Sequence, residues 1–585
     1  MSGPASNGDP DVVHVSRAQR ALDRWAREYP DRAGFIGADG RELTWRQTAV
    51  AVRTLAGRLR DAGAGAGDRV AVMAGRSRHG LAALLAVRAN GSSAVLLDER
   101  HPVERLRWTV RDAGCVALVS SEPEAAAVGL PVIGTTGSET TADVSPPDGP
   151  GDRPWARTEP GAEAYVVYTS GTTGRPKGVR IGSAALENLL AGAETLGYRP
   201  GSRAVCVVSP GFDGWLWSVL TPFVNGVTSV VIDTAAGNVE QALADRYIDN
   251  LCMTPTLYAA IEKLPAVEVA VVAGERCPDA LVARLRERAD RVINVYGPTE
   301  ATIAATMADT ARGDDPRTIG RPLPGYTVTV VDGDLGEVAP GTTGEVLIGG
   351  AGVALGYVGA AADTDRFVEL GGVRHFRTGD LGTLRADGQL ECLGRMDNQV
   401  KVGGFRTELE EIESIACEVP GVDRAVAYLR GDPPTLAVAV RTAPGTGLDD
   451  GLRRRLAAAF AARLPRQLCP TFTHRIAEVP LEPTGKVARR EVAALGDAEQ
   501  AGPGGTRSGP AGGVLDGVLD AWSGVFGQSV AEDADFFAIG GHSLLAAQLA
   551  SRIEAHLGIT VSITDVLTTR TPGALALRIE EMRQA

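Results

Sequence analysis

Tyr168 to Gly178 reads YTSGTTGRPKG, and this stretch decides the fold class. It follows a β-branched run, AYVVY at 164–168, which predicts a strand that ends in a loop rich in glycine and hydroxyl side chains. Glycine lets a backbone approach a polyanion closely, and free N–H groups and hydroxyls donate hydrogen bonds to phosphate oxygens. Lys177 adds a mobile positive charge. The stretch therefore predicts a nucleotide-phosphate site, although its spacing differs from the G-x-x-x-x-G-K-[ST] spacing of P-loop proteins.

Length and composition limit the classes of protein to consider. A chain of 585 residues is too long for one hydrophobic core, so we expect several domains. A net charge of −13 argues against a nucleic-acid-binding surface. The 7 cysteines form no C-x-x-C pair, which fits a reducing cytoplasm and disfavours a zinc site. No apolar run has the length of a membrane span, and the polar N-terminus lacks a signal-peptide core. We therefore expect a cytoplasmic protein whose partners include neither nucleic acid nor a membrane.

Helical and β-branched patterns alternate along most of the chain, which predicts α/β layers with largely parallel sheets. Amphipathic helices are expected at 17–28 and 46–62, and buried strands at 70–73, 93–97, 204–208 and 229–232. The predicted bodies are a disordered tail (1–14), a large α/β unit (15–396), a smaller unit (397–496), a Gly/Pro-rich linker (497–513) and a helical C-terminal unit (514–585).

The ordered string TSGTTG-x-PKG closely resembles the phosphate loop of adenylate-forming enzymes, which include acyl-CoA ligases, luciferases and the adenylation domains of nonribosomal peptide synthetases. Further strings follow in the family's order: NVYGPTE at 294–300, FRTGDL at 376–381, GRMDNQVK at 394–401 and PTGKV at 483–487. Each of these strings, taken alone, would also fit an ordinary turn or a surface residue. Their occurrence in the family's order favours a functional role. The resemblance covers nearly the whole chain and implies an ATP- and Mg²⁺-dependent ligase with a large α/β subdomain and a small α+β subdomain.

The same resemblance implies roles for individual residues. Tyr296 would stack on adenine, Asp380 would bind the ribose hydroxyls, and Glu300 would bind Mg²⁺, for which a carboxylate is chemically suitable. Lys486 would contact the substrate carboxylate during attack on the α-phosphate. Asp397 would be the hinge about which the small subdomain turns between an adenylating and a thioester-forming pose. Further ATP contacts are expected from Thr169, Ser170, Gly171, Thr172, Thr173, Gly174, Lys177, Thr299 and Arg395. The sequence departs from the family at Leu355 and Gly403, where arginine is common.

The string GFDGWLW at 211–217 indicates that the substrate is an amino acid and not another carboxylic acid. Adenylation domains for amino acids carry an aspartate at the position of Asp213, because a buried α-ammonium needs a counter-charge. The resemblance places the pocket lining at Asp213, Gly214, Trp217, Cys252, Val271, Ala273, Val295, Ile303, Ala304 and Lys486. Because Asp213 and Lys486 are the charged members, we expect a large apolar, aromatic amino acid, with tryptophan slightly favoured over phenylalanine and tyrosine.

The C-terminal unit contains DFFAIGGHSLL at 535–545, which resembles the attachment motif of peptidyl carrier proteins. Ser543 precedes an apolar stripe at helical spacing, so the bare pattern also fits a plain N-cap serine. The resemblance implies an all-α, four-helix carrier domain with 4′-phosphopantetheine on Ser543, attached by a phosphopantetheinyl transferase. A helix N-terminus favours the added phosphodiester.

The chain shows neither an H-H-x-x-x-D condensation motif nor a G-x-S-x-G thioesterase elbow, and it ends shortly after the carrier motif. We therefore expect a free-standing didomain for antibiotic or other secondary metabolism. It would pass its amino acid to a synthetase module or tailoring enzyme in trans, with an MbtH-like helper as a further partner. Two alternatives stay open: a stand-alone acyl- or aryl-acid CoA ligase, disfavoured by Asp213 and Ser543, and a carrier or scaffold with an inactive ligase domain.

Overall fold

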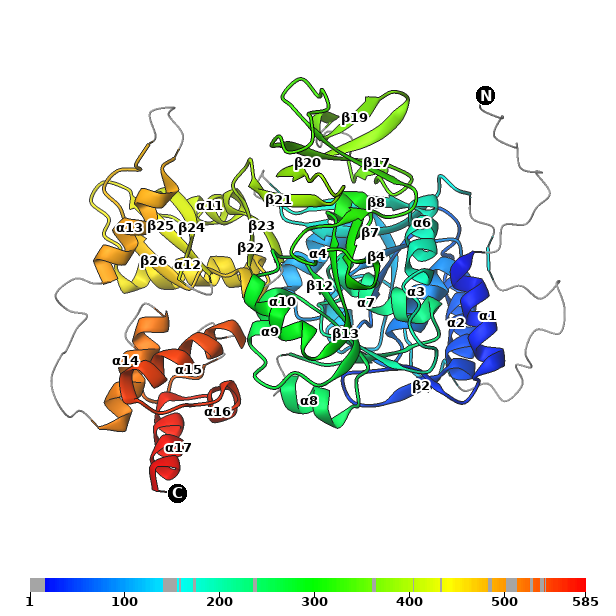
Figure 1. The fold of residues 1–585 in the computed structure, drawn as a ribbon. Coiled ribbons are helices and arrows are strands. Elements are labelled where there is room, and N and C mark those ends of the chain that lie inside the picture. Colours follow the sequence, from blue (N-terminus) through cyan, green and yellow to red (C-terminus); the bar gives the residue numbers. More distant parts are fainter. Residues whose placement is uncertain are drawn as a thin grey trace.

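Three bodies follow one another along the chain in the computed structural model (Figure 1). The structure describes residues 16–139, 155–156, 159–171, 175–234, 239–359, 364–402, 405–431, 434–481, 487–500, 513–526, 530–536, 541 and 543–584. Four predicted site residues, Thr172, Thr173, Gly174 and Lys486, therefore lie outside the described residues, as does the side chain of Ser543.

Two large sheets form the scaffold of the first body. The first has seven strands in the order β18 (Gly356–Tyr357), β8 (Lys177–Gly182), β7 (Glu163–Thr169), β4 (Ser93–Leu96), β3 (Arg69–Met73), β5 (Cys115–Ser120) and β6 (Val132–Ile133). The second has nine in the order β15 (Arg321–Pro322), β14 (Thr306–Asp309), β13 (Ala289–Tyr296), β12 (Val267–Ala273), β11 (Asn250–Met253), β9 (Arg203–Cys206), β10 (Thr228–Val231), β1 (Ala33–Ile36) and β2 (Glu42–Thr44). Their central strands pair in parallel, as the alternating pattern predicts.

Helices cover both faces of these sheets. Between the sheets lie α1 (Arg17–Glu28), α2 (Trp45–Asp61), α3 (Gly80–Ala89), α6 (Ser183–Glu194) and α7 (Asp213–Val224). Outside them lie α4 (Val103–Asp112), α5 (Ala125–Val128), α8 (Val239–Asp245), α9 (Pro255–Ala259) and α10 (Asp279–Arg286), with the short 3₁₀ turns η1 (Thr299–Ala301) and η2 (Thr310–Arg312) at loops. Strand β3 shows the two-faced pattern: Val70 and Val72 face the inner helices, while Ala71 and Met73 face α4 and α5. Such strands are apolar on both faces because both faces are buried.

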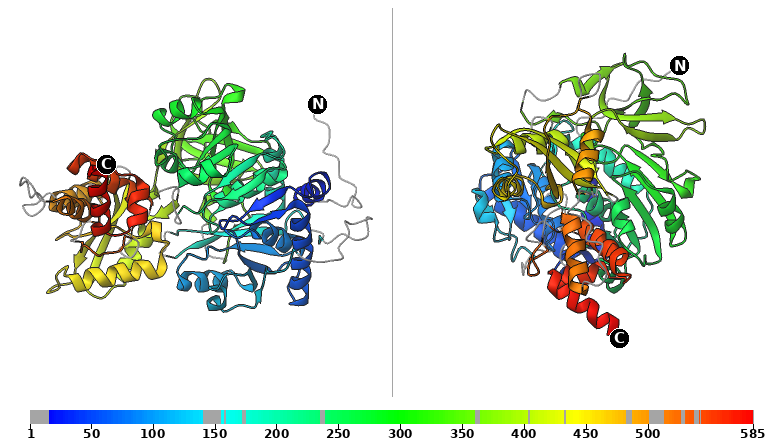
Figure 2. Two further views of the ribbon diagram at one scale, coloured as in Figure 1. Left: turned by 90° about the horizontal axis from the view of Figure 1, so that it is seen from below. Right: turned by 90° about the vertical axis from the view of Figure 1, so that its left-hand side faces the viewer.

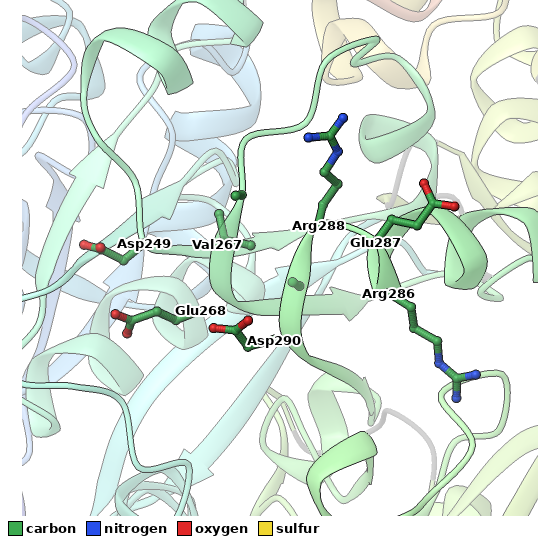
Figure 3. A pocket seen from close by; sticks show the side chains of 9 residues that line it. Asp249, Val267, Glu268, Arg286, Glu287, Arg288 and Asp290 are labelled. Atoms are coloured by element: carbon green, nitrogen blue, oxygen red, sulfur yellow. The ribbon is translucent and has the colours of Figure 1, made fainter.

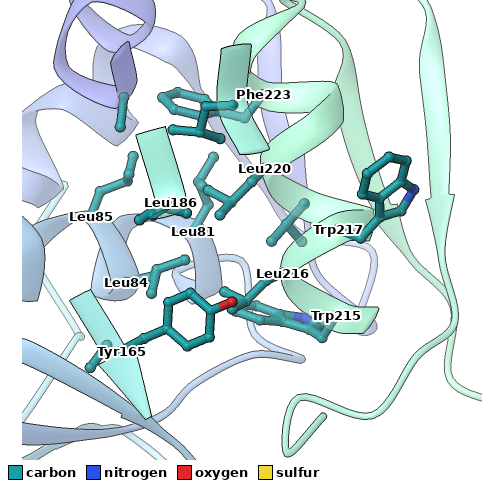
Figure 4. Close-up of a cluster of buried hydrophobic side chains, with 14 of the residues drawn as sticks. Leu81, Leu84, Leu85, Tyr165, Leu186, Trp215, Leu216, Trp217, Leu220 and Phe223 are labelled. Carbon is teal, nitrogen blue, oxygen red and sulfur yellow. The ribbon is translucent and has the colours of Figure 1, made fainter. Parts of the chain in front are cut away.

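The inner layer holds the largest apolar cluster. Helix α3 is buried along its length except at Arg88, as expected for a helix that is apolar all round. Figure 4 shows its Leu81 and Leu84 gathered with Trp215 and Leu216 of α7 and Tyr165 of β7. This packing fixes α7, and with it the start of the helix at Asp213, against the rigid interior.

A third sheet has no parallel strands, and here the expectation of largely parallel sheets does not hold. It consists of β16 (Tyr326–Val331), β17 (Gly344–Gly350), β20 (Val373–Leu384), β19 (Phe367–Leu370) and β21 (Leu390–Arg395), preceded by η3 (Thr364–Arg366). All its pairs are antiparallel. Short connections without a crossover helix permit only this arrangement.

The small subdomain begins with a two-stranded ribbon, β22 (Gln399–Val402) and β23 (Phe405–Glu408). A three-stranded sheet follows, made of β24 (Val422–Arg430), β25 (Thr435–Thr442) and β26 (Phe472–Arg475). Helices α11 (Leu409–Cys417) and α12 (Asp450–Arg463) cover one face, with η4 (Arg466–Leu468) after α12, and α13 (Arg489–Gln500) covers the other. Helix α13 continues past residue 496, where the linker is expected, because its last residues are good helix formers.

The C-terminal unit is helical, as predicted. Its helices α14 (Val514–Phe526), α15 (Ser543–Leu557), α16 (Ile563–Thr569) and α17 (Pro572–Gln584) share a core around Trp522 and Phe536. Gly558 follows α15 with a φ of 66°, in the left-handed region typical of a helix C-cap. Figures 1 and 2 show this unit beside the small subdomain. Among the described residues, no helix is both long and apolar enough to cross a membrane.

Candidate active site

The predicted phosphate loop connects β7 to β8. Thr169, the last residue of β7, pairs with Lys177, the first of β8, so the loop between them closes an antiparallel hairpin. Gly171 is required there, because a Cβ at this position would overlap the backbone carbonyl oxygen of Arg175. The Thr169 hydroxyl is buried and has no hydrogen-bond partner among the described residues. A buried, unpaired donor beside a lysine suits an incoming phosphate oxygen.

Glu300, the predicted metal ligand, lies in η1 with a fully buried carboxylate. Tyr357 donates a hydrogen bond to Oε1 at 2.8 Å, Arg406 donates one to Oε2 at 2.7 Å, and the Lys177 Nζ lies 3.8 Å from Oε1. Burial opposes ionisation, but the charges of Arg406 and Lys177 lower the pKa of Glu300 to about 2. A carboxylate that stays ionised, next to the phosphate loop, fits a Mg²⁺ that bridges to a triphosphate.

The residues expected at the nucleoside lie together at the junction of the second and third sheets. The Tyr296 hydroxyl donates to Asp380 Oδ2 at 2.5 Å, and the Arg395 Nη1 donates to Asp380 Oδ1 at 2.7 Å. Asp380 is buried and carries a hydrogen bond on each oxygen, so it can exchange these donors for the two ribose hydroxyls.

The predicted hinge residue stands between β21 and β22. Arg395 Nε donates to Asp397 Oδ1 at 2.6 Å, and Arg366 Nη2 donates to Asp397 Oδ2 at 3.2 Å. Burial opposes ionisation, but the hydrogen bonds from Arg395 lower the pKa of Asp397 to about 2. Both arginines belong to the large subdomain, so Asp397 is where the small subdomain is tied to it.

Asp213 is the first residue of α7, close to the metal carboxylate. Burial raises the pKa of Asp213 despite a hydrogen bond from the Thr299 side chain. In the part of the chain that the structure describes, no lysine, arginine or histidine forms an ion pair with it. A half-buried carboxylate at a helix start, with a raised pKa and no ion pair among the described residues, is suited to receive an ammonium group.

The other predicted pocket residues surround Asp213 on one face of the nine-stranded sheet. Cys252 pairs with Val271, and Ala273 pairs with Val295, so the carboxyl ends of β11, β12 and β13 meet side by side. Such an edge is the usual ligand site of a parallel sheet. All the described members with side chains belong to, or pack against, one apolar cluster: Trp217, Cys252, Val271, Ala273, Val295, Ile303 and Ala304. Gly214 contributes no side chain, and a Cβ there would lie 3.3 Å from the Val208 side chain. Burial raises the pKa of the Cys252 thiol to about 12, so this wall is uncharged at neutral pH.

The backbone after η1 is strained. Thr302 and Ile303 have φ values of 55° and 73°, in the left-handed region that β-branched residues rarely adopt. Thr302 is held there by its hydrogen bond to the Gly352 carbonyl at 2.6 Å. Strain of this kind costs about 1–3 kcal/mol per residue and collects at functional sites. Here it turns Ile303 and Ala304 toward the apolar cluster.

The small subdomain reaches the site through β23, which the sequence reasoning did not include. The Ser170 hydroxyl donates to the Arg406 carbonyl at 3.2 Å and accepts from the Glu408 N–H at 3.0 Å. Phe405 packs edge-on against Phe212, with ring centroids 4.6 Å apart. A basic and an aromatic residue beside the Gly-Gly pair at 403–404 are the signal that could have marked this strand.

A second contact between the subdomains lies at α4. Arg105 Nη1 is 3.3 Å from Glu411 Oε1 and donates to the Arg463 carbonyl at 3.2 Å. Both side chains are buried by the contact. This contact lies outside the active site and adds to those at Asp397 and β23.

A surface hollow of about 380 Å³ lies away from this site (Figure 3). It is lined by Asp249, Glu268 and Asp290, with Arg286 and Arg288 pointing in opposite directions. These residues stand where β11, β12 and β13 begin, so the hollow opens at the end of the strands opposite to the pocket. Among the described residues, no group of three or more His, Cys, Asp or Glu is placed to hold a metal ion.

Comparisons with known proteins agree with this geometry. Residues 22–358 match the family of AMP-binding enzymes, and residues 516–579 match the phosphopantetheine attachment site. Novobiocin biosynthesis protein H of Streptomyces niveus is 36% identical over 98% of this chain and 98% of its own length. Phosphinothricin tripeptide synthetase PhsC of Streptomyces viridochromogenes is 33% identical over 98% of this chain, which spans 54% of that protein.

Solved structures show the same architecture. A holo nonribosomal peptide synthetase protein containing adenylation and PCP domains, bound to a vinylsulfonamide inhibitor, superposes with a TM-score of 0.76 and 24% identity over 96% of both chains. A four-domain nonribosomal peptide synthetase bound to AMP and glycine is 27% identical, with a TM-score of 0.58, over 97% of this chain and 43% of its own.

Proposed function

Because the chain belongs to the AMP-binding enzymes, as a nonribosomal peptide synthetase adenylation domain followed by a peptidyl carrier domain, we propose that it activates a large aromatic amino acid and loads it on Ser543. The enzyme is an ATP-dependent, AMP-forming ligase that uses Mg²⁺. Its carrier domain bears 4′-phosphopantetheine on a serine, placed there by a phosphopantetheinyl transferase. The single observation that carries the proposal is the half-buried Asp213 carboxylate with its raised pKa, at the start of a helix whose Trp217 belongs to the apolar cluster.

In the first step, the amino-acid carboxylate attacks the α-phosphorus of ATP and pyrophosphate leaves. Asp213 holds the α-ammonium, which orients the carboxylate toward the nucleotide. Lys177 and the Thr169 hydroxyl would contact the phosphates, and Glu300 would hold Mg²⁺, which would supply positive charge for the leaving pyrophosphate. Tyr296 and Asp380 position the nucleoside. Lys486 completes this set as a donor to the reacting oxygens, a role that rests on its motif.

In the second step, phosphopantetheine on Ser543 would supply the thiol that takes up the aminoacyl group, with AMP as the leaving group and loss of the thiol proton. The chain's own contribution is positional. Asp213 keeps the ammonium in place, and the aromatic pair Phe212 and Phe405 excludes water at the junction of the subdomains. Ser543 stands at the start of α15, where the helix N-terminus favours a phosphodiester.

The amino acid is an aromatic one because the pocket combines an indole wall with small residues. The residues expected to line the pocket combine the indole of Trp217 with the small Gly214, Ala273 and Ala304. An aromatic ring fills such a space and stacks on the indole, whereas a polar side chain would be left without partners. Among aromatic amino acids, the sequence pattern favours tryptophan over phenylalanine and tyrosine.

Amino-acid-dependent exchange of pyrophosphate into ATP tests the activation step. All proteinogenic amino acids are compared, with and without an MbtH-like helper, and we expect exchange with aromatic amino acids. Exchange only with aryl or fatty acids that lack an α-amino group would instead favour a CoA ligase, and no exchange at all would favour the inactive scaffold.

Ser543→Ala tests the loading step separately. We expect it to abolish loading and to leave exchange at the wild-type rate, because Ser543 takes no part in the first step. Ser562→Ala, which removes a helix cap on the same unit, serves as the matched control and should still be loaded. Loading that persists in the Ser543 variant would contradict the assignment.

A further inference from the structure

Arg406 forms an ion pair with the Glu300 carboxylate, which the first step needs as a ligand for Mg²⁺. We propose that Arg406 takes the place of Mg²⁺ on Glu300 after pyrophosphate has left, so that the metal-bound state and the docked β23 exclude each other. This inference rests on the proposed function, in which Glu300 binds the metal of Mg·ATP. Arg406 would then be a positioning residue of the small subdomain, and it would pair with Glu300 during the second step.

The ion pair between Arg406 and Glu300 is short and buried. The Arg406 Nη1 lies 2.7 Å from Glu300 Oε2, and the two side chains are 14% and 0% exposed. Burial alone would disfavour the Arg406 cation, but the charge of Glu300 raises its pKa, so the guanidinium is charged. A carboxylate buried this deeply needs a cation in every state of the enzyme. Arg406 supplies one when β23 is docked, and the metal supplies one when it is not.

The backbone of β23 also forms hydrogen bonds with the phosphate loop. The Ser170 hydroxyl is engaged by the Arg406 carbonyl and by the Glu408 N–H, at 3.2 Å and 3.0 Å. Ser170 is an expected phosphate contact, so the docked β23 removes both a phosphate donor and the metal carboxylate from the nucleotide. One strand therefore blocks two groups that hold Mg·pyrophosphate.

The exclusion is mutual because the two cations share one carboxylate. In the docked pose Arg406 lies 2.7 Å from Glu300 Oε2 and Lys177 lies 3.8 Å from Oε1, so each oxygen already faces a cation. A metal that Glu300 ligates would have to displace Arg406 from this carboxylate. Because binding linkage is reciprocal, Mg·ATP disfavours the docked pose and the docked pose weakens Mg·ATP. Departure of pyrophosphate with its metal then permits docking, which sets the order of the two steps.

Calorimetric titration of the full chain tests this competition. The probe is α,β-methylene-ATP, which cannot transfer AMP, titrated with saturating Mg²⁺ or with EDTA and without amino acid. We expect Arg406→Gln to bind the Mg²⁺ complex roughly threefold or more tightly than wild type, because the competing cation is gone. The EDTA titrations should differ less. Arg441→Gln, which removes an exposed arginine of the same subdomain paired with Asp423, is the matched control and should bind like wild type.

Two further variants keep the test decisive. Arg406→Lys keeps a cation opposite Glu300, so it should bind the Mg²⁺ complex of α,β-methylene-ATP with wild-type affinity. This result can be read even if the Arg406→Gln variant folds poorly. In a Glu300→Gln background, Arg406→Gln should give no further tightening, because the shared carboxylate is absent. Equal or weaker binding by Arg406→Gln, or tightening that survives in the Glu300→Gln background, would overturn the inference. Failure of the proposed function would show differently, as a wild-type protein without amino-acid-dependent exchange.

Discussion

The two halves of the active site differ in how their charges are satisfied. In the phosphate-and-metal half, Glu300 and Ser170 are both engaged by β23 of the small subdomain. In the amino-acid half, Asp213 has a raised pKa and no ion pair among the described residues, and the strands of one sheet carry four further members of the pocket. The described residues of the amino-acid half belong to the large subdomain, and Lys486 is its one expected contribution from the small subdomain, whereas the phosphate half is engaged by β23 of the small subdomain.

This difference fits the order of the chemistry. The amino acid must stay bound through both steps, and the described residues of its site lie outside the moving part. The phosphates are needed only in the first step, and their site is the one that the small subdomain closes. Variants in each half should accordingly affect different substrates, and each prediction below tests that separation.

Asp213→Asn should have the largest effect. The amide keeps the shape but leaves the substrate ammonium buried without a counter-charge, which costs about 3–5 kcal/mol, or roughly 10²–10³-fold in affinity. We expect the KM for the amino acid to rise by this factor in pyrophosphate exchange, while binding of Mg·α,β-methylene-ATP stays unchanged. A matching loss of nucleotide binding would break the separation of the two halves.

Gly171→Ala should act on the other half. The added methyl group overlaps the Arg175 carbonyl, so the phosphate loop must shift, at about 1–3 kcal/mol. We expect the KM for Mg·ATP to rise roughly ten- to a hundredfold, with the KM for the amino acid nearly constant. Gly192→Ala in α6 is the control, because its methyl group meets nothing within 4 Å. The separation would fail if Gly171→Ala raised the amino-acid KM as much.

Acid should weaken amino-acid binding before it weakens nucleotide binding. Burial raises the pKa of Asp213, and only the carboxylate form holds an ammonium, so protonation as the pH falls through that pKa removes the site. Below it, the KM for the amino acid should rise about tenfold per pH unit. Glu300, with a pKa of about 2, stays ionised over the same range, so the KM for Mg·ATP should stay flat. A pH profile that is identical in the Asp213→Asn variant would show that another group titrates.

Cys252→Ala should have the smallest effect. Removing the sulfur enlarges one wall of the pocket, which alters the preference among aromatic amino acids by about 1 kcal/mol, or roughly fivefold. Relative exchange rates with tryptophan, phenylalanine and tyrosine measure the change. Mg·ATP binding should not move, and a shift there would place Cys252 outside the amino-acid half.

Much of the large subdomain could be predicted from the sequence because its signals are local. Buried parallel strands appear as short apolar runs, and 70–73 and 93–97 coincide closely with β3 and β4. Helix α1 has the predicted bounds, and α2 begins one residue earlier than expected, after the capping box of Thr44 and Gln47. The third sheet could not be predicted in this way, because its strands are partly exposed and carry no crossover helices.

The active-site residues likewise fall into those that local motifs predict and those that depend on contacts between distant segments. Motif residues such as Tyr296, Asp380 and Arg395 meet as the resemblance implies, since each stands in a short, ordered string. Arg406 and Tyr357 could not be found, because their contacts to Glu300 join segments far apart in sequence and depend on how the subdomains dock. The contact of Arg105 with Glu411 was missed for the same reason.

Mass measurement of the intact holo-protein tests the central claim most directly. The phosphopantetheinylated chain is incubated with ATP, Mg²⁺ and single amino acids, and the mass added to the carrier is read. The account predicts one aminoacyl group, from an aromatic amino acid, on the wild type and none on the Asp213→Asn variant at the same substrate concentration. Loading of a small or charged amino acid instead, or equal loading of both proteins, would contradict it.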